Sequence, residues 1–136
     1  MSTPARILLV DDDLTFRTVL GGELERLGYD IAKAGSGAEA LTELPKADPA
    51  VVLLDLRLPD ASGLDVLKAI RAERPHVDVI MLTGHGTIDT AIDAIRIGAF
   101  DYVSKPCPLD EIEVRISRAL ERQSLRHRAT LLERAL

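Results

Sequence analysis

Two runs of aliphatic residues in the first half of the chain each end abruptly on carboxylates. Residues 6–10 lead into three aspartates at 11–13, and residues 51–54 lead into Asp55. An apolar run without polar alternation predicts a strand that is covered on both faces, as in the centre of a parallel sheet. Ligands of such sheets bind at the carboxyl edge, so these aspartates are the first candidates for a functional site. An aspartate in this place can also serve only as a turn cap.

Helical periodicity alternates with further strand-like segments along the rest of the chain. Apolar residues recur at spacings of three and four, after capping residues such as Asp13 and Ser36 and before glycine or proline. The expected strands cover residues 6–10, 29–34, 51–55, 77–82 and 100–104. The expected helices cover residues 14–27, 37–44, 64–73, 88–97 and 109 to beyond 120.

Two of these helices carry more specific expectations. Pro45 is expected to end the second helix at Leu44, because proline lacks the amide donor that a continuing helix uses. The inward face of that helix is expected to carry Ala38, Leu41 and Leu44. The fourth helix is expected to begin after a cap at Thr87 and to have an inward stripe of Ile88, Ala91, Ile92 and Ile95.

Five strands alternating with five helices predict an α/β fold with a parallel sheet, right-handed crossovers and helices on both faces. The carboxylates of Asp11, Asp12 and Asp55 share one crevice only if the first and third strands are neighbours. The flavodoxin-like strand order 2-1-3-4-5 has this property, and we therefore expect it.

The last helix has no stop signal before the chain ends, and its apolar face shifts near Leu120. We predict a globular domain over residues 1–120 and a helical extension over residues 121–136. Leu125, Ala129, Leu132 and Leu136 repeat at four, three and four, the spacing of a coiled-coil seam. We expect the tail to form a homodimer in this way. Its many arginines are interpreted as a solvated face and not as a nucleic-acid contact.

The composition narrows the classes of function. The net charge is −5 and aromatic residues make up 3% of the 136 residues, so binding of the domain to nucleic acid by charge or base stacking is not expected. No secretory signal or membrane-spanning run is present, which predicts a cytoplasmic protein without a membrane contact. The single Cys107 agrees with a reducing compartment and is interpreted as a small hydrophobic residue.

The clustered carboxylates need a counter-charge. Two unit charges at about 4 Å repel by about 4 kcal/mol at an effective dielectric constant of 20. All-oxygen ligation with water completing the shell favours Mg²⁺ over zinc or copper. Lys105 and Thr83 follow the last two strands and add an ammonium and a hydroxyl at the same edge. Such a set suits phosphoryl transfer to an ionised carboxylate.

Five separated motifs follow one another in the chain: Val10-Asp11-Asp12-Asp13, Leu54-Asp55-Leu56-Arg57-Leu58-Pro59, Thr83-Gly84, Tyr102 and Lys105-Pro106. Together they resemble the receiver domain of bacterial two-component response regulators, over the chain up to about Leu120. The resemblance implies that Asp55 accepts a phosphoryl group from a sensor histidine kinase. The implied Mg²⁺ ligands are Asp12 directly, Asp11 indirectly, Asp55 and the backbone carbonyl of Arg57. The resemblance also implies that Lys105 pairs with the phosphoryl group and that Thr83 turns its hydroxyl toward it. The implied switch residues are Thr83 and Tyr102.

Residues 83–87 and 98–102 further resemble receivers attached to σ54-dependent, NtrC-like activators, and the helical tail fits the linker of that subgroup. The implied function is a signalling switch that controls an output such as transcription, and not an enzyme. Together with the need to fold Lys105 back to the crevice, the resemblance also predicts a cis Lys105-Pro106 bond.

Two alternatives of other classes stay open. An aspartyl-nucleophile phosphatase normally has a second carboxylate two residues after the nucleophile, where this chain has Arg57. A flavodoxin-like flavin-binding module normally has a hydroxyl-rich phosphate loop after the first strand, where this chain has aspartates.

Overall fold

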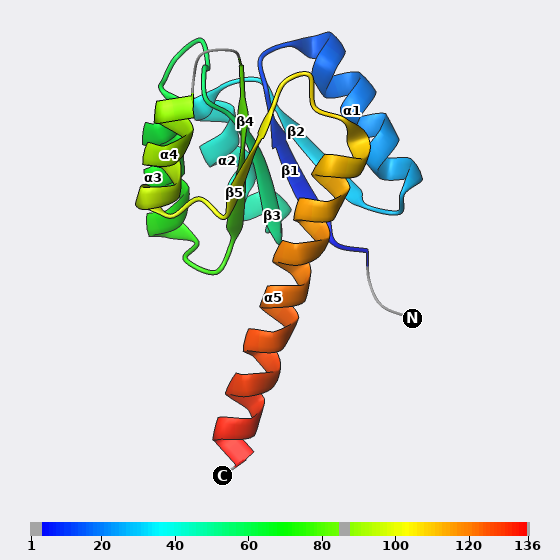
Figure 1. The fold of residues 1–136 in the computed structure, drawn as a ribbon, viewed down its shortest axis with the longest axis vertical. Coiled ribbons are helices and arrows are strands. Elements are labelled where there is room, and N and C mark those ends of the chain that lie inside the picture. The colour runs from blue at the N-terminus through cyan, green and yellow to red at the C-terminus, as the bar shows by residue number, and fades with distance from the viewer. Residues whose placement is uncertain (1–3, 85–87, 136) are drawn as a thin grey trace.

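The protein forms one twisted parallel sheet with helices on both faces (Figure 1). The computed structural model describes residues 4–84 and 88–135. The strand order is β2-β1-β3-β4-β5, which confirms the predicted flavodoxin-like topology. The strands are β1 (Arg6–Val10), β2 (Asp30–Ala34), β3 (Val51–Asp55), β4 (Asp78–Thr83) and β5 (Asp101–Ser104). The predicted cap at Thr87, its neighbours His85 and Gly86, and the seam residue Leu136 lie outside the described residues.

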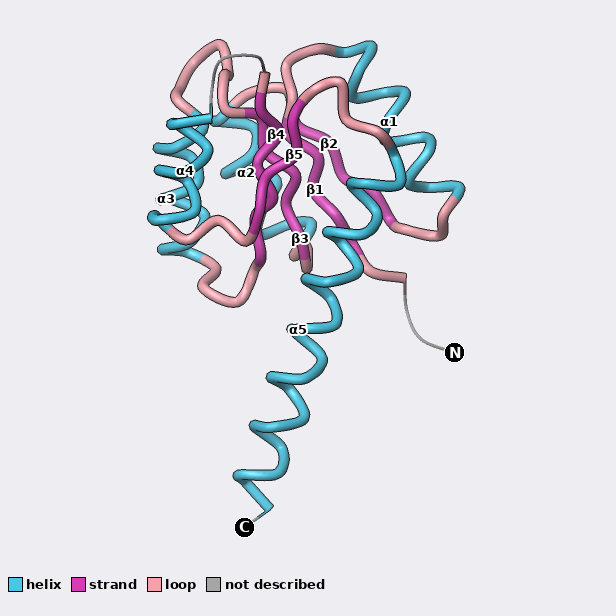
Figure 2. The backbone as a smooth tube through the Cα atoms, in the orientation of Figure 1, coloured by secondary structure: helices cyan, strands magenta, loops and turns pink. Residues whose placement is uncertain are grey.

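The sheet separates the helices into two layers (Figure 2). One apolar cluster lies between the sheet and each layer of helices. The helices are α1 (Leu14–Arg26), α2 (Gly37–Ala47), α3 (Gly63–Glu73), α4 (Ile88–Ile97) and α5 (Leu109–Ala135). Helices α2, α3 and α4 cover one face and α1 and α5 cover the other. Strand β1 supplies both clusters, because Leu8 and Val10 point to the first while Ile7 and Leu9 point to the second. The continuous apolar run thus marks a strand buried on both faces.

Helix α2 is longer than the sequence predicted. It continues through Pro45 to Ala47 and ends at Asp48, which has a left-handed backbone with φ of 46°. Proline removes one helical donor, but tertiary contacts hold the last turn, since Ala47 is buried and its carbonyl accepts from Arg6 Nη1 at 3.1 Å. The prediction of the residues on its inward face was also partly wrong. Ala38 is exposed, and Ala40 is buried on that face instead.

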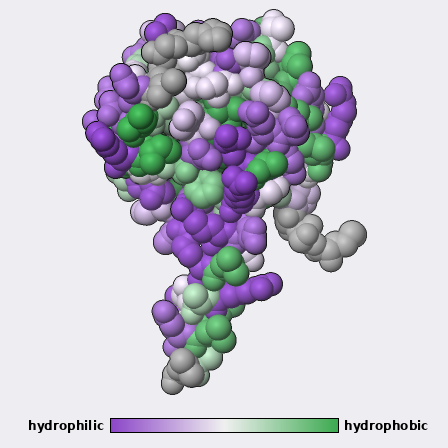
Figure 3. Space-filling view, in the orientation of Figure 1, coloured by the Kyte–Doolittle hydropathy of each residue, from purple (hydrophilic) through white to green (hydrophobic). Residues whose placement is uncertain are grey.

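The inward stripe predicted for α4 is wrong at Ile92 and Ile95, while the side chain of Ile88 lies outside the described part of the structure. Ile92 and Ile95 are 43% and 40% exposed, whereas Ala91 and Ala94 are fully buried. Small side chains let the helix approach the sheet and α3 closely, and this places the two isoleucines on the flank of the helix. An apolar patch is visible at the left of the molecule in Figure 3, where Figure 1 draws α4, and both isoleucines are exposed on this helix.

Helix α5 packs on the sheet in its first part and projects beyond the body in its second (Figure 1). Ile112, Ile116 and Ala119 are buried in the second cluster. Contacts with the body continue past the predicted division at Leu120, as far as Arg126, through the buried carboxylate of Asp78. Among the described residues, no helix combines the length and apolar character that a membrane crossing requires.

Arg122, Gln123 and Arg126 of α5 surround Asp78 at the start of β4. Gln123 Nε2 donates to Asp78 Oδ2 and to the carbonyl of Ala50, both at 2.8 Å, while Arg126 lies 3.6 Å from Asp78. Arg122 also pairs with Asp78 and stacks 4.4 Å from the centre of the Phe100 ring. We call these four residues, Asp78, Arg122, Gln123 and Arg126, the tail clamp. The tail clamp fixes the direction in which α5 leaves the body.

Candidate functional site

Three carboxylates converge at the carboxyl edge of the sheet. Asp11 follows β1 and Asp55 ends β3, and these adjacent strands run in register with Val10 opposite Leu54. One oxygen of each of Asp11, Asp12 and Asp55 lies within 4.8 Å of the others. Asp11 is completely buried, Asp55 is 8% exposed and Asp12 is exposed. Solvent therefore reaches the cluster from the side of Asp12.

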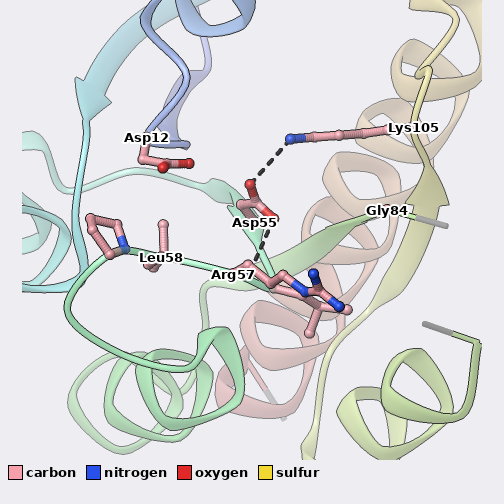
Figure 4. A pocket seen from close by; sticks show the side chains of 8 residues that line it. Asp12, Asp55, Arg57, Leu58, Gly84 and Lys105 are labelled. Carbon is pink, nitrogen blue, oxygen red and sulfur yellow. Dashed lines mark hydrogen bonds and ion pairs between the residues drawn. The ribbon is translucent and has the colours of Figure 1, made fainter. Parts of the chain in front are cut away.

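Lys105 reaches this cluster from the end of β5. Its Nζ donates to Asp11 Oδ2 at 2.7 Å. It also donates to Asp55 Oδ2 at 3.1 Å, the contact drawn as a dashed line in Figure 4. The predicted cis Lys105-Pro106 bond is confirmed. The lysine also lies over the ring of Phe16 from α1, with Nζ 4.5 Å from the ring centroid. One ammonium thus joins groups from β1, β3 and α1.

Burial and charge act against each other in this cluster. Burial raises the pKa of Asp11 above its ordinary 3.8, although hydrogen bonds from Lys105 and the Asp13 amide lower it in part. Burial lowers the pKa of Lys105, but the hydrogen bond that Lys105 donates to Asp11 and the charge of Asp55 outweigh that effect and raise the pKa above 10.5. The lysine is therefore charged at neutral pH and the carboxylates are incompletely compensated.

The loop after β3 holds Asp55 from the other side. The Arg57 amide donates to Asp55 Oδ1 at 3.1 Å, and Arg57 pairs with Ser62 in an isolated bridge. The loop closes on Gly63, where an added Cβ would lie 2.4 Å from the Asp55 carbonyl oxygen. Only glycine fits there.

Sequence reasoning missed Gly63 and Asp60 as site-supporting residues. Asp60 accepts from the amides of Gly37 and Ala38 at the start of α2, at 2.8 and 3.0 Å, and these bonds lower its pKa. Asp60 therefore ties the loop after β3 to a helix N-terminus, where a carboxylate is favoured. The turn-like sequence Asp60-Ala61-Ser62-Gly63 was the available sign of a constrained loop.

Thr83 and Tyr102 lie beside the cluster and not in it. Thr83 is buried, and its hydroxyl is directed to β5, 3.4 Å from the Val103 carbonyl and 3.5 Å from Ser104 Oγ. Tyr102 is half-buried and packs on the first apolar cluster. Of the seven predicted site residues, the structure brings together five: Asp11, Asp12, Asp55, Arg57 and Lys105.

A crevice of about 330 Å³ opens over Asp55. Asp12, Asp55, Arg57 and Lys105 line it together with Leu58 and Gly84 (Figure 4). The possible metal ligands among the described residues of this site are carboxylate oxygens. The ammonium of Lys105 also lines the crevice. This donor set fits Mg²⁺, which prefers carboxylates and retained water.

The comparison with known proteins agrees with this geometry. Residues 7–117 match the family described as the response regulator receiver domain. The chain is a response regulator receiver domain. Membership places this receiver domain in phosphorylation-dependent two-component signalling.

The receiver domain is similar to the amino-acid sequences of several larger regulators. It is 40% identical over 116 residues to Regulatory protein LuxO of Vibrio vulnificus, covering 85% of this chain and 26% of that protein. It is 38% identical over 136 residues to Regulatory protein AtoC of Escherichia coli, covering 100% of this chain and 30% of that protein. It is 42% identical over 128 residues to the alginate biosynthesis regulator AlgB of Pseudomonas putida, covering 94% and 29%. The chain thus spans under a third of the length of these relatives.

Solved structures show the same fold. The receiver domain protein of Clostridium thermocellum matches with a TM-score of 0.86 and 36% identity over 89% of this chain and 98% of that one. NtrX of Brucella abortus matches with a TM-score of 0.89 and 35% identity, over 95% of this chain and 29% of that one. The predicted resemblance to σ54-activator receivers is confirmed.

Proposed function

We propose that this receiver domain accepts a phosphoryl group on Asp55 from a sensor histidine kinase and converts it into a conformational signal. The observation that carries the proposal is the position of Asp55, which opens to the crevice while Lys105 and the Arg57 amide hold its two oxygens. A carboxylate oxygen of Asp55 attacks phosphorus, and the bond to the donor breaks with its electron pair leaving on the donor.

Asp12 is the direct Mg²⁺ ligand in this proposal, and Asp11 acts indirectly. Asp12 is exposed, whereas Asp11 is buried with one oxygen bonded to the Asp13 amide and the other to Lys105. Asp55 and the backbone carbonyl of Arg57 complete the protein ligands. Bound Mg²⁺ would neutralise charge on the phosphoryl oxygens.

Thr83 and Tyr102 transmit the change in charge. A phosphoryl group adds roughly −1.5 to −2 charges beside Lys105. Thr83 then turns its hydroxyl from β5 to the new oxygens, and α4 and Tyr102 move with it. The weak geometry of the present hydroxyl contacts, at 3.4 and 3.5 Å, supports a hydroxyl that is ready to change partner. The protein is a switch in this account, not an enzyme.

Mass spectrometry with a small phosphodonor, acetyl phosphate, tests the assignment. We expect one phosphoryl adduct in the presence of Mg²⁺, none in excess EDTA, and none in Asp55→Asn. Asp65→Asn is the matched control, because Asp65 is an exposed carboxylate on α3. An adduct that persists in Asp55→Asn would contradict the proposal.

Residues 121–136 form a linker that pairs with a second copy in this proposal, while residues 1–120 form the phosphoacceptor domain. Leu125 and Leu132 are 55% and 67% exposed on the tail, which supports an apolar seam that the described residues leave uncovered. The domain itself makes no nucleic-acid or membrane contact, and it acts in the cytoplasm, where a kinase can supply the phosphoryl group.

Light scattering on matched variants tests the pairing. Leu132→Glu places a charge in the seam and should give a monomer at concentrations where the wild type is a dimer. Leu131→Glu is the control, because Leu131 is 50% exposed but lies about 100° away around the helix. Both variants leave the tail clamp intact. Equal masses for all three proteins would contradict the pairing.

A further inference from the structure

The ammonium of Lys105 lies over the face of the Phe16 ring. Nζ lies 4.5 Å from the ring centroid while it also donates to Asp11 and Asp55. The face of an aromatic ring attracts a cation through its quadrupole. The Lys105 side chain is 27% exposed, so this ring also removes one direction in which the ammonium would meet water.

The start of α1 fixes Phe16 in this place. The Asp13 carboxylate accepts from the Phe16 amide at 3.1 Å as the cap of the helix, and the side chain packs on the second apolar cluster. The segment that supplies Asp11 and Asp12 therefore also supplies the ring. Lysine has a flexible four-carbon stem with a rotatable ammonium, so its two carboxylate contacts alone do not determine its position.

We propose that Phe16 is a positioning residue for phosphoryl transfer, holding the Lys105 ammonium between Asp11 and Asp55 by its contact with the ring face. The proposal rests on the proposed function of Asp55. Phe16 touches neither the phosphoryl donor nor the acceptor and acts only through Lys105. An aliphatic side chain would fill the same space on α1 without attracting the ammonium.

The rate of phosphorylation by acetyl phosphate in Mg²⁺ tests this role in the intact chain. Phe16→Leu should lower the rate constant roughly two- to five-fold, the range for a partly exposed cation–π contact. Phe16→Tyr, which keeps the ring face, should restore it to within the error of the wild type. Glu25→Gln is the matched control, because Glu25 is exposed on the same helix, nine residues after Phe16 and about half a turn away around the axis.

NMR of Lys105 separates positioning from packing. The ε-methylene protons should show an upfield ring-current shift in the wild type and Phe16→Tyr, and lose it in Phe16→Leu. A wild-type rate in Phe16→Leu would overturn the proposal. So would an equal loss of rate in Phe16→Leu and Phe16→Tyr with an unchanged Lys105 shift. Failure of the proposed function is recognised separately, since Asp55→Asn would then still be phosphorylated.

Discussion

Lys105 Nζ lies closer to Asp11 than to Asp55, at 2.7 Å against 3.1 Å. The chain thus supplies a counter-charge for the fully buried Asp11, while none of the described residues makes an ion pair with the exposed Asp12 carboxylate that would compete with an incoming cation. The two aspartates that follow β1 consequently have different chemical environments. A charge balance of this kind makes the stability of the protein depend on pH.

Asp11→Asn should stabilise the metal-free protein near neutral pH. Burial raises the folded-state pKa of Asp11 above 3.8, so its contribution to stability is present below pH 3.8 and is lost as the pH rises through the folded-state pKa. Asparagine does not ionise, so its contribution to stability does not change over this pH range. Thermal unfolding should therefore show a higher midpoint for Asp11→Asn at about pH 7 and a smaller difference at about pH 4. A variant less stable than the wild type at both pH values would contradict this balance.

Mg²⁺ should reduce the difference in thermal stability between Asp11→Asn and the wild type, because it balances the negative charge of the same carboxylates. A ligand at 100 times its Kd stabilises the folded state by about 2.7 kcal/mol. We expect this gain in the wild type, a smaller gain in Asp11→Ala and none in Asp12→Ala. Thermal unfolding with and without Mg²⁺ measures it, and Asp65→Asn serves again as an exposed control on α3. Equal gains in Asp12→Ala and the wild type would remove Asp12 from the metal site.

Thr83→Ala should uncouple α4 from phosphorylation without preventing it. Within residues 4–84 and 88–135 the hydroxyl makes its hydrogen bonds to β5, so its loss leaves Asp55 and Lys105 in place. The amide shifts of α4 on phosphorylation, measured by NMR, should become markedly smaller. Ser104→Ala is the control, because it removes the partner hydroxyl at 3.5 Å but not Thr83 itself. Wild-type shifts in a fully phosphorylated Thr83→Ala protein would show that the coupling uses another route.

Gln123→Ala should weaken the tail clamp by about 0.5 to 1.5 kcal/mol, the net contribution of a typical hydrogen bond. The amide of Gln123 donates to the Ala50 carbonyl and to Asp78, and both acceptors keep another donor, since the Asp78 amide lies 3.3 Å from the Ala50 carbonyl and Arg126 lies 3.6 Å from the Asp78 carboxylate. Urea unfolding measures the loss. Ser124→Ala changes the exposed neighbouring residue and should be neutral. If both variants unfolded at the same urea concentration, the clamp would contribute nothing to stability.

Cys107 should react slowly with alkylating reagents. Burial raises the pKa of its thiol to about 11. At about pH 8 its thiolate fraction is then roughly a hundred-fold below that of a free cysteine with a pKa of about 8.5. Mass spectrometry after iodoacetamide treatment should show slow labelling in the native protein and ordinary labelling in urea. Rapid native labelling would indicate an open environment around Cys107.

The sheet could be predicted because its signals are local. The run at 51–54 has no polar alternation and ends on Asp55, and β3 is indeed buried on both faces. The neighbourhood of Asp11 and Asp55 then followed from the strand order. The position of Lys105 followed from the resemblance and from its place at the end of the last strand.

The misses arise where packing overrides local preference. Proline at position 45 is unfavourable in an isolated helix, yet burial of Ala47 and its bond to Arg6 maintain the last turn. In α4, hydrophobicity does not reveal that close approach favours alanine over isoleucine. The tail clamp joins residues more than 40 positions apart, and its polar members looked like a solvated face. Such contacts depend on the assembled fold and have no periodic signature.

The tail clamp also determines where the apolar edge of the tail faces. Gln123 points to the body, and Leu125, two residues later, lies about 200° around the helix, with Ala129 and Leu132 on the same side. Two tails joined side by side along this edge would therefore hold their globular bodies outward, on opposite flanks of the pair. Asp55 lies at the far end of the sheet from Asp78. In such an arrangement a kinase could reach the crevice of either copy while the copies remain joined.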